Sequence, residues 1–215
     1  MTCESGAFIA FEGGEGAGKS TQARLLANAL RSHGLTVLTT REPGGTPGAE
    51  AIRTLLLNPP GAEWPPEAEA LLFAAARADH VAHLIRPALA RGEWVICDRF
   101  VDSSRAYQGA AGGLGDEAIL RLHSFGSAGL RPDLVILLEG DETALGERLA
   151  ARDGQASDAI GGRAADYHRA VAAAFRSLAE RDPRGFVRVD AIGTPEDVHA
   201  RIIEAVAPLI EKARA

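Results

Sequence analysis

The sequence predicts an α/β fold in which a five-stranded parallel sheet carries helices on both faces. Two observations predict it: five short runs are apolar on both faces of a strand, and amphipathic segments of helical length separate them. Strands that are apolar on both faces must be covered on both sides, which is typical of parallel sheets. The expected strands span residues 7–12, 35–40, 93–99, 133–139 and 185–191.

Seven segments between and after these strands have the spacing of amphipathic helices. They span residues 19–33, 48–57, 67–91, 116–128, 142–151, 164–181 and 195–212. Gly34 is expected to end the first helix, and Thr194-Pro195 to begin the last one. Residues 150–165 are small, polar and weakly periodic, so they form either a slack linker or a mobile flap.

The composition indicates an ordinary globular protein. A chain of 215 residues with 46% apolar and 24% charged residues predicts one domain over residues 1–215. A net charge of -6 argues against broad nucleic-acid or membrane binding. Two cysteines, Cys3 and Cys97, make no disulfide framework, and Cys97 is expected to be buried in a strand. No leader-like segment and no apolar run of ~18 residues occurs, so we expect a cytoplasmic protein.

A glycine-rich loop follows the first predicted strand. Residues 13–20, GGEGAGKS, fit the pattern G-x-x-x-x-G-K-[ST] at the head of a helix. Glycines let backbone N–H groups point at an anion, the lysine reaches the β- and γ-phosphates, and the serine hydroxyl can hold Mg²⁺. The sequence therefore predicts a nucleoside triphosphate site made by Gly13, Gly14, Glu15, Gly16, Ala17, Gly18, Lys19, Ser20 and Thr21.

Other motifs narrow the class of protein that carries this loop. The guanine-binding N-K-x-D motif of GTPases is missing, since neither Asn28 nor Asn58 fits it, and no LSGGQ-like transporter signature occurs. A small phosphotransferase remains, and it needs a second phosphate site. Arg41 and Arg99 both follow predicted strands, where open α/β sheets bind ligands. Asp98 is expected to help hold Mg²⁺, directly or through water.

Five motifs along the chain resemble those of bacterial thymidylate kinases: FEGGEGAGKST, TREPGGT, LLFAAARADH, CDRFVDSSRAYQG and RPDLVILLE. The resemblance implies transfer of the γ-phosphoryl group of ATP to dTMP, giving dTDP, with Mg²⁺ as cofactor and a homodimer as the assembly. It also implies the five-stranded nucleoside monophosphate kinase fold. We therefore expect ATP and dTMP as partners, and neither nucleic acid nor membrane.

The resemblance implies that dTMP binds in a region of about residues 41–108, and that Glu12, earlier in the chain, also contributes to its site. The implied dTMP-binding residues are Glu12, Arg41, Pro43, Phe73, Arg77, Arg99, Ser104, Tyr107 and Gln108.

Each of these residues has an implied role. Phe73 would stack on thymine, with a plain core position on the 67–91 helix as the less favoured alternative. Arg77, Ser104 and Gln108 would contact the base, and Tyr107 would crowd the sugar 2′ position and reject ribose.

The remaining roles concern the sugar and the phosphate. Glu12 would approach the sugar hydroxyl, whereas Arg41 and Arg99 would hold the dTMP phosphate. Pro43 would stiffen the loop after the second strand, with a cis bond as an option. His80 and His83 are expected to be surface or core histidines.

The predicted lid, at about residues 148–165, departs from the family pattern. Relatives show D-R-[IF]-E and then V-R, whereas this chain has DAIG at 158–161 and Val171-Ala172. Ala159 and Ala172 thus replace arginines, and Gly161 replaces a glutamate. The catalytic residues are expected to be Lys19 and Arg99 with a lid arginine, taken in the order Arg152, Arg163, Arg148.

Two alternatives stay open at this point. The acceptor could be another nucleoside monophosphate, such as UMP or CMP, although the predicted tyrosine at the 2′ position argues against ribonucleotides. The atypical lid also leaves room for a nucleotide-binding protein with impaired catalysis.

Overall fold

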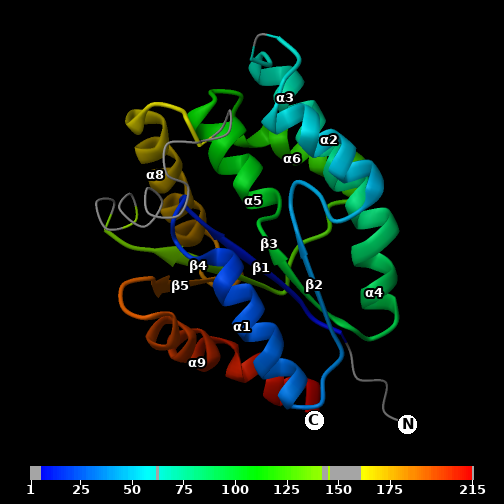
Figure 1. The fold of residues 1–215 in the computed structure, drawn as a ribbon, viewed down its shortest axis with the longest axis vertical. Helices are drawn as coiled ribbons and strands as arrows, with labels where there is room; N and C mark the ends of the chain where they lie inside the picture. Colours follow the sequence, from blue (N-terminus) through cyan, green and yellow to red (C-terminus); the bar gives the residue numbers. More distant parts are fainter. Residues whose placement is uncertain (1–5, 62, 142–144, 146–160, 215) are drawn as a thin grey trace.

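The computed structural model describes residues 6–61, 63–141, 145 and 161–214. Within them a five-stranded parallel sheet has the order β2-β3-β1-β4-β5, which confirms the predicted class (Figure 1). The strands are β1 (Phe8–Gly13), β2 (Val37–Arg41), β3 (Trp94–Asp98), β4 (Leu134–Glu139) and β5 (Phe186–Asp190). The strand order reverses at β1, and open sheets bind ligands at such a point.

Helices connect the strands, most of them in the predicted places. They are α1 (Lys19–Ser32), α2 (Pro47–Leu57), α3 (Pro66–His80), α4 (Arg86–Ala90), α5 (Val101–Ser104), α6 (Asp116–Ser127), α8 (Ala165–Arg181) and α9 (Pro195–Arg214). Gly34 follows α1 with φ 86°, as its expected role at the helix end requires. The side chains of Thr194 and Asp197 each accept a hydrogen bond from the other's backbone N–H at the start of α9, which is a reciprocal cap.

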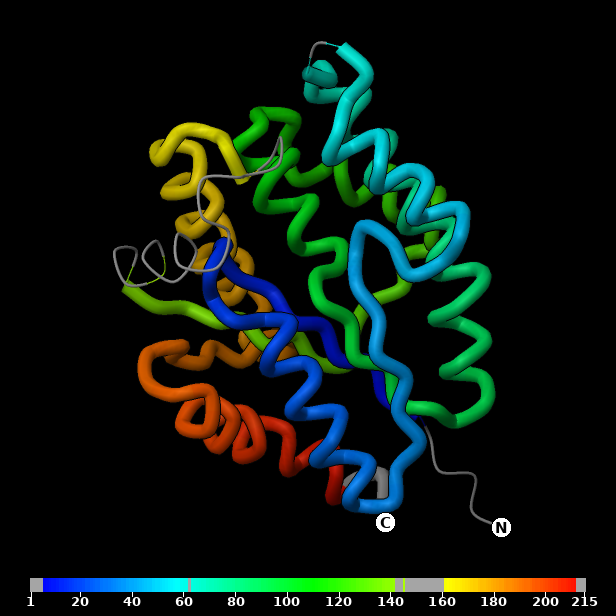
Figure 2. Tube along the Cα trace, viewed as in Figure 1, coloured from blue at the N-terminus to red at the C-terminus, as the bar shows by residue number. Residues whose placement is uncertain are grey.

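The two faces of the sheet bury different layers of helices. On one face Ile9 and Phe11 pack with Leu26 of α1 and Ile202 of α9. Figure 2 shows α1 (blue) and α9 (red) side by side on this face. The other face packs mainly against α3, α4, α6 and α8, and Cys97 is buried there as expected.

Two helical regions differ from the prediction. The helix expected over residues 67–91 is divided by a π-helical segment, η1 (Val81–Ile85), in which Arg86 N–H donates to Val81 O. Pro87 follows and has no N–H to continue the ordinary pattern, so a widened turn fits there. A helical region that the sequence did not predict runs through α5 and a second π segment, η2 (Arg105–Ala111).

Other sequence predictions fall outside what the structure covers. The helix expected at 142–151 lies outside the described residues, except for Leu145. Among the helices that are described, none combines the length and the apolar character needed to cross a bilayer.

Candidate active site

The glycine loop joins the central strand β1 to the first turn of α1. Gly13 has φ 136°, and a Cβ there would lie 2.3 Å from Leu138 O of the neighbouring strand, so only glycine fits. Gly18 has φ 85° and directly precedes Lys19, the first residue of α1. The loop therefore has the strand–loop–helix setting in which backbone N–H groups and the helix N-terminus can bind an anion.

Lys19 is buried at the head of α1. Its Nζ donates a hydrogen bond to Gly14 O at 2.6 Å. Burial, and then the nearby positive charge of Arg99, lower the pKa of Lys19 to about 8. A bound phosphate would raise this pKa again, because a negative charge nearby favours the charged ammonium.

Two oxygen-bearing side chains meet beside the lysine. Ser20 Oγ donates a hydrogen bond to Asp98 Oδ2, which brings the start of α1 to the end of β3. Asp98 stands in register with Phe11 of β1 and Arg41 of β2. Hydroxyl and carboxylate oxygens are the protein ligands that Mg²⁺ accepts beside phosphates, so this pair fits the predicted metal position.

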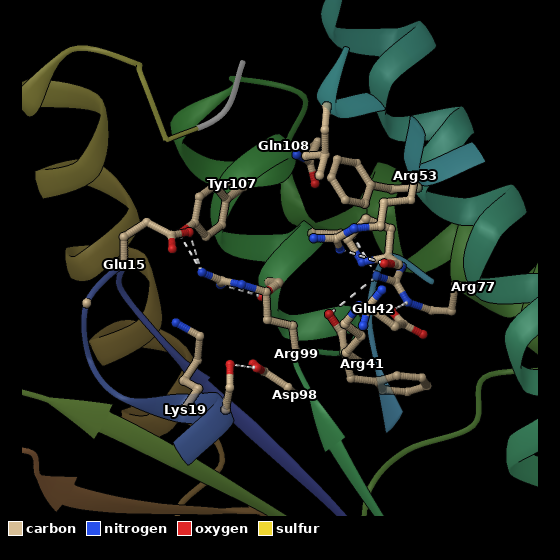
Figure 3. A pocket seen from close by; sticks show the side chains of 18 of the residues that line it. Glu15, Lys19, Arg41, Glu42, Arg53, Arg77, Asp98, Arg99, Tyr107 and Gln108 are labelled. Atoms are coloured by element: carbon tan, nitrogen blue, oxygen red, sulfur yellow. Dashed lines mark hydrogen bonds and ion pairs between the residues drawn. The ribbon is translucent and has the colours of Figure 1, made fainter. Parts of the chain in front are cut away.

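Arg99 lies across from the loop at the carboxyl end of β3, in the left-handed region with φ 69°. Its Nη2 donates to Glu15 Oε1 at 2.5 Å and its Nη1 to Ser103 Oγ at 3.0 Å. The guanidinium carbon lies 5.1 Å from the ring centre of Tyr107. In Figure 3 the guanidinium of Arg99 lies between Tyr107 and Lys19. Arg41, by contrast, is 54% exposed and pairs with Glu50 at 3.0 Å.

Glu12, near the end of β1, is fully buried. One of its oxygens accepts from the N–H groups of Phe100 and Ser103, at 2.8 and 3.0 Å, and the other accepts from Ser103 Oγ at 2.6 Å. Burial, and then the charge of Asp102, raise the pKa of Glu12 to about 7. In this structure Glu12 fixes the turn after Arg99, so its predicted contact with the sugar stays a prediction.

A buried cluster of polar side chains surrounds Glu42, at the start of the loop after β2. Glu42 Oε2 accepts from Arg77 Nε at 2.7 Å, and Glu42 Oε1 lies 3.2 Å from His80 Nδ1. Arg77 Nη2 also donates to Ser104 Oγ at 3.0 Å. The sequence analysis missed Glu42, although an acidic residue between Arg41 and a proline in the second-site loop was a usable signal.

The loop after β2 has a further arginine that sequence reasoning missed. The Glu42-Pro43 peptide bond is cis, the option considered from the sequence. Arg53 of α2 donates from Nη1 to Pro43 O at 2.8 Å and also lines the cavity. Its position on the helix predicted at 48–57 carried no signal that pointed to this role.

These residues surround one cavity of about 490 Å³. From the loop, Glu15, Gly16 and Gly18 through Thr21 line it. From the second site, the lining includes Arg41, Pro43, Phe73, Arg77, Asp98, Arg99, Ser104, Tyr107 and Gln108. Of the described candidates, Glu12, Gly13, Gly14, Ala17 and Arg163 are not part of the lining.

Of the three predicted lid arginines, the structure describes Arg163. Arg148 and Arg152 lie outside the described residues. Arg163, just before α8, donates to Glu69 Oε2 and stacks on Tyr167 with its guanidinium carbon 4.7 Å from the ring centre. Its predicted catalytic role remains untested.

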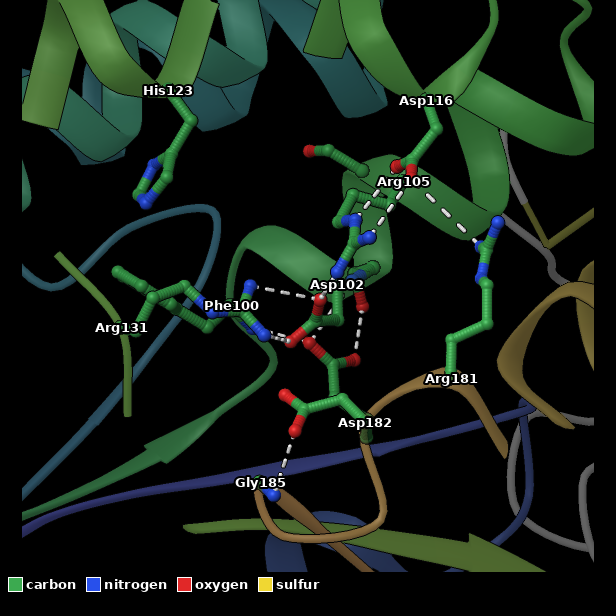
Figure 4. A network of polar contacts seen from close by, with 12 residues as sticks. Phe100, Asp102, Arg105, Asp116, His123, Arg131, Arg181, Asp182 and Gly185 are labelled. Atoms are coloured by element: carbon green, nitrogen blue, oxygen red, sulfur yellow. Dashed lines mark hydrogen bonds and ion pairs between the residues drawn. The ribbon is translucent and has the colours of Figure 1, made fainter. Parts of the chain in front are cut away.

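A buried ion-pair network holds the α5–η2 segment that carries Ser104, Tyr107 and Gln108. Asp102 is fully buried and accepts from Arg131 at 2.9 and 3.0 Å and from Arg105 at 2.8 Å (Figure 4). Arg105 makes two further bonds to Asp116, at 2.7 and 2.8 Å. Because a carboxylate buried at this depth requires its partners, the segment has little freedom to shift.

The arrangement places a glycine loop of the phosphate-binding pattern and several arginines around the same cavity, a combination that fits two-substrate phosphoryl transfer. The sequence model of a family described as thymidylate kinase matches residues 11–202. The chain belongs to the thymidylate kinase family. Its members phosphorylate dTMP, and the chain is accordingly a nucleoside monophosphate kinase that uses ATP.

Individual members of the thymidylate kinase family are similar over most of their length. A thymidylate kinase of Rhizorhabdus wittichii is 55% identical, with 95% of this chain and 99% of that one covered. One from Gluconobacter oxydans is 51% identical, with 94% of each chain covered. The crystal structure of a thymidylate kinase from Ehrlichia chaffeensis superposes with a TM-score of 0.77 at 30% identity, covering 94% of this chain and 99% of that one.

Proposed function

We propose that the cavity binds ATP and dTMP end to end and transfers the γ-phosphoryl group in line, with the side-chain roles given below. One observation carries the proposal: the loop lysine Lys19 and the strand-end arginine Arg99 come from different elements and line the same cavity. Two phosphate-binding cations on either side of a transferred group supply positioning and charge neutralisation, which together account for most of such catalysis.

On the donor side, the loop from Gly13 to Thr21 holds the triphosphate of ATP. Lys19 reaches the β- and γ-phosphates with a compact ammonium that a planar guanidinium would not replace. The metal would be Mg²⁺, held by Ser20 Oγ and the carboxylate of Asp98, directly or through water. When bound, it neutralises charge on the phosphate oxygens.

On the acceptor side, Arg99 holds the phosphate of dTMP, and Arg41 adds a second positive charge at the cavity edge. Arg99 is only 15% exposed, so its contact with an anion is weakly screened. Glu15 holds Arg99 in place on the side of the ATP loop.

The nucleoside of dTMP lies along the wall formed by α3 and η2. Phe73 offers an aromatic face to thymine, and Ser104 and Gln108 are polar groups at the base. Nε and Nη2 of Arg77 are held by Glu42, Ser104 and Phe100 O, which supports a role for Nη1 at the base edge. Tyr107 excludes a 2′-hydroxyl, so the enzyme prefers deoxyribonucleotides.

The protein works as one domain over residues 1–215 and as a homodimer. The family model spans most of that length, which supports a single functional unit. Sedimentation or light scattering at assay concentrations tests the assembly, and a monomeric active enzyme would contradict it.

An ADP-release assay with a panel of acceptors tests the function. With ATP and Mg²⁺, we expect turnover with dTMP to exceed that with UMP and CMP, and we expect chelation of the metal to abolish it. Preferred turnover of UMP or CMP would contradict the acceptor assignment.

A further inference from the structure

The carboxylate of Glu69 connects the cavity wall with the segment that precedes α8. Its Oε1 accepts a hydrogen bond from Gln108 Nε2 at 2.8 Å, and its Oε2 accepts one from Arg163 Nη2. Glu69 is on α3 one helical turn before Phe73, so it lies next to the aromatic part of the wall. Neither the family motifs nor the spacing along the chain indicated this link.

Arg163 is itself held in place. Its Nη1 donates to Tyr167 Oη at 2.6 Å, and Tyr167 Oη donates to the carbonyl oxygen of Tyr107 at 2.8 Å. The side chains of Arg163 and Glu69 are 21% and 9% exposed. A pair this sheltered is screened much less than a surface salt bridge, so it can hold the carboxylate in one orientation.

The Glu69 carboxylate fixes the orientation of the Gln108 side-chain amide. A carboxylate has only acceptors, so only the NH₂ of the amide can pair with it. The carbonyl Oε1 of Gln108 must then face away from Glu69. Gln108 lines the cavity, and in Figure 3 the amide oxygen is on the cavity side of the side chain.

We propose that Glu69, held by Arg163, is a positioning residue that fixes Gln108 with its acceptor oxygen toward the base. The site then selects bases that present a ring N–H at this edge, which are thymine and uracil, against cytosine, which presents an unprotonated ring nitrogen. The inference rests on the proposed function, since it needs the base to lie between Phe73 and Gln108. Two acceptors facing each other leave both unpaired, and buried sites reject such ligands strongly.

The test compares kcat/KM for dTMP, dUMP and dCMP in the wild type and in Glu69→Gln. The substituted amide can offer either a donor or an acceptor, so Gln108 is free to turn over. We expect the dTMP/dCMP ratio to fall about tenfold or more in Glu69→Gln, with dUMP following dTMP. If all three values fall by the same factor, Glu69 is merely a structural link and the inference is wrong.

Arg163 variants separate positioning from catalysis. Arg163→Ala should lower the same ratio by a smaller factor, and Arg163→Lys should restore it, because the ammonium still pairs with Glu69. Arg169→Ala is the matched control: this exposed arginine on α8 pairs with Asp166 of the same helix, and the ratio should stay unchanged. An equal loss of kcat for every acceptor in Arg163→Ala, at unchanged KM, would instead assign Arg163 to the phosphoryl group.

A double-mutant cycle tests whether Glu69 acts through Gln108. In a Gln108→Ala background, Glu69→Gln should change the dTMP/dCMP ratio no further, since the group that it orients is gone. An additional change there would overturn the inference. A wild type that does not phosphorylate dTMP at all would instead overturn the proposed function, a result easily told from an active enzyme with an unchanged ratio.

Discussion

Lys19 Nζ donates a hydrogen bond to Gly14 O at 2.6 Å, so the ammonium of the loop is held against the backbone of the same loop. This contact keeps the charge inside the turn where the phosphates of ATP are proposed to bind. We expect Lys19→Ala to fold normally and to lose ~10²-fold or more in kcat, because a charge matched to the developing phosphate charge is removed.

Steady-state kinetics and circular dichroism check this prediction. Arg24→Ala, an exposed position on α1 outside the cavity lining, serves as the control. A Lys19→Ala enzyme with near-normal kcat would show that the loop does not hold the triphosphate.

Glu12 should make the stability of the protein depend on pH. Its pKa rises from 4.5 to about 7 on folding. Between these pH values the folded chain therefore keeps a proton on Glu12 that the unfolded chain has lost. The free energy of unfolding therefore falls as pH rises through this window. Glu12→Gln removes the titration, and its stability relative to wild type should improve between pH ~5 and ~8 by an amount on the order of 3 kcal/mol.

Chemical denaturation at both pH values measures the change. Glu67→Gln on the exposed side of α3 is the control, and it should follow the wild type. Parallel pH profiles for wild type and Glu12→Gln would mean that burial of Glu12 carries no such penalty.

Tyr107 and Arg99 should affect different properties of the acceptor. Tyr107→Ala should relax discrimination against ribonucleotides, because it removes the ring proposed to lie against C2′, whereas Arg99→Ala should weaken all acceptors alike. Tyr107→Phe keeps the ring and should keep the discrimination. The measurement is kcat/KM for dTMP and UMP; an equal loss for both in Tyr107→Ala would count against the assignment.

The lid arginines are the last group to test. The loop interior carries no arginine, so the charge near the γ-phosphoryl group should come from Arg152, or else from Arg163 or Arg148. Such an arginine contributes roughly 10³–10⁵ in rate. Arg152→Ala should lower kcat steeply with little change in the KM for dTMP, since the contact forms only around the reacting groups.

Single and combined alanine variants at the three positions check this prediction, with exposed Arg176→Ala as the control. If every variant keeps near-normal kcat, no lid arginine supplies the charge.

Periodicity and motif context predicted the strands, the glycine loop and most helices, because these depend on local patterns. The helical region from Val101 to Ala111 was not predicted, because its π turns and small residues give no 3.6-residue repeat of apolar positions. Likewise the π segment before Pro87 divides a helix that looked continuous in sequence.

The sequence also did not predict the polar pairs between residues far apart in the chain. Glu42 with Arg77, and Glu69 with Arg163, are 35 and 94 residues apart, so nothing local predicts them. His80 was expected on the surface or in the core, and it is fully buried beside Glu42 and Thr40. Which side chains face the cavity depends on the order of the strands in the sheet, and local sequence patterns do not give that order.

Single-turnover product analysis with γ-labelled ATP, dTMP and Mg²⁺ tests the central claim most directly. We predict one labelled dTDP for each ADP formed in the wild type, and both products formed ~10²-fold or more slowly in Lys19→Ala. ATP and dTMP bound without transfer, or ADP formed without dTDP, would contradict it.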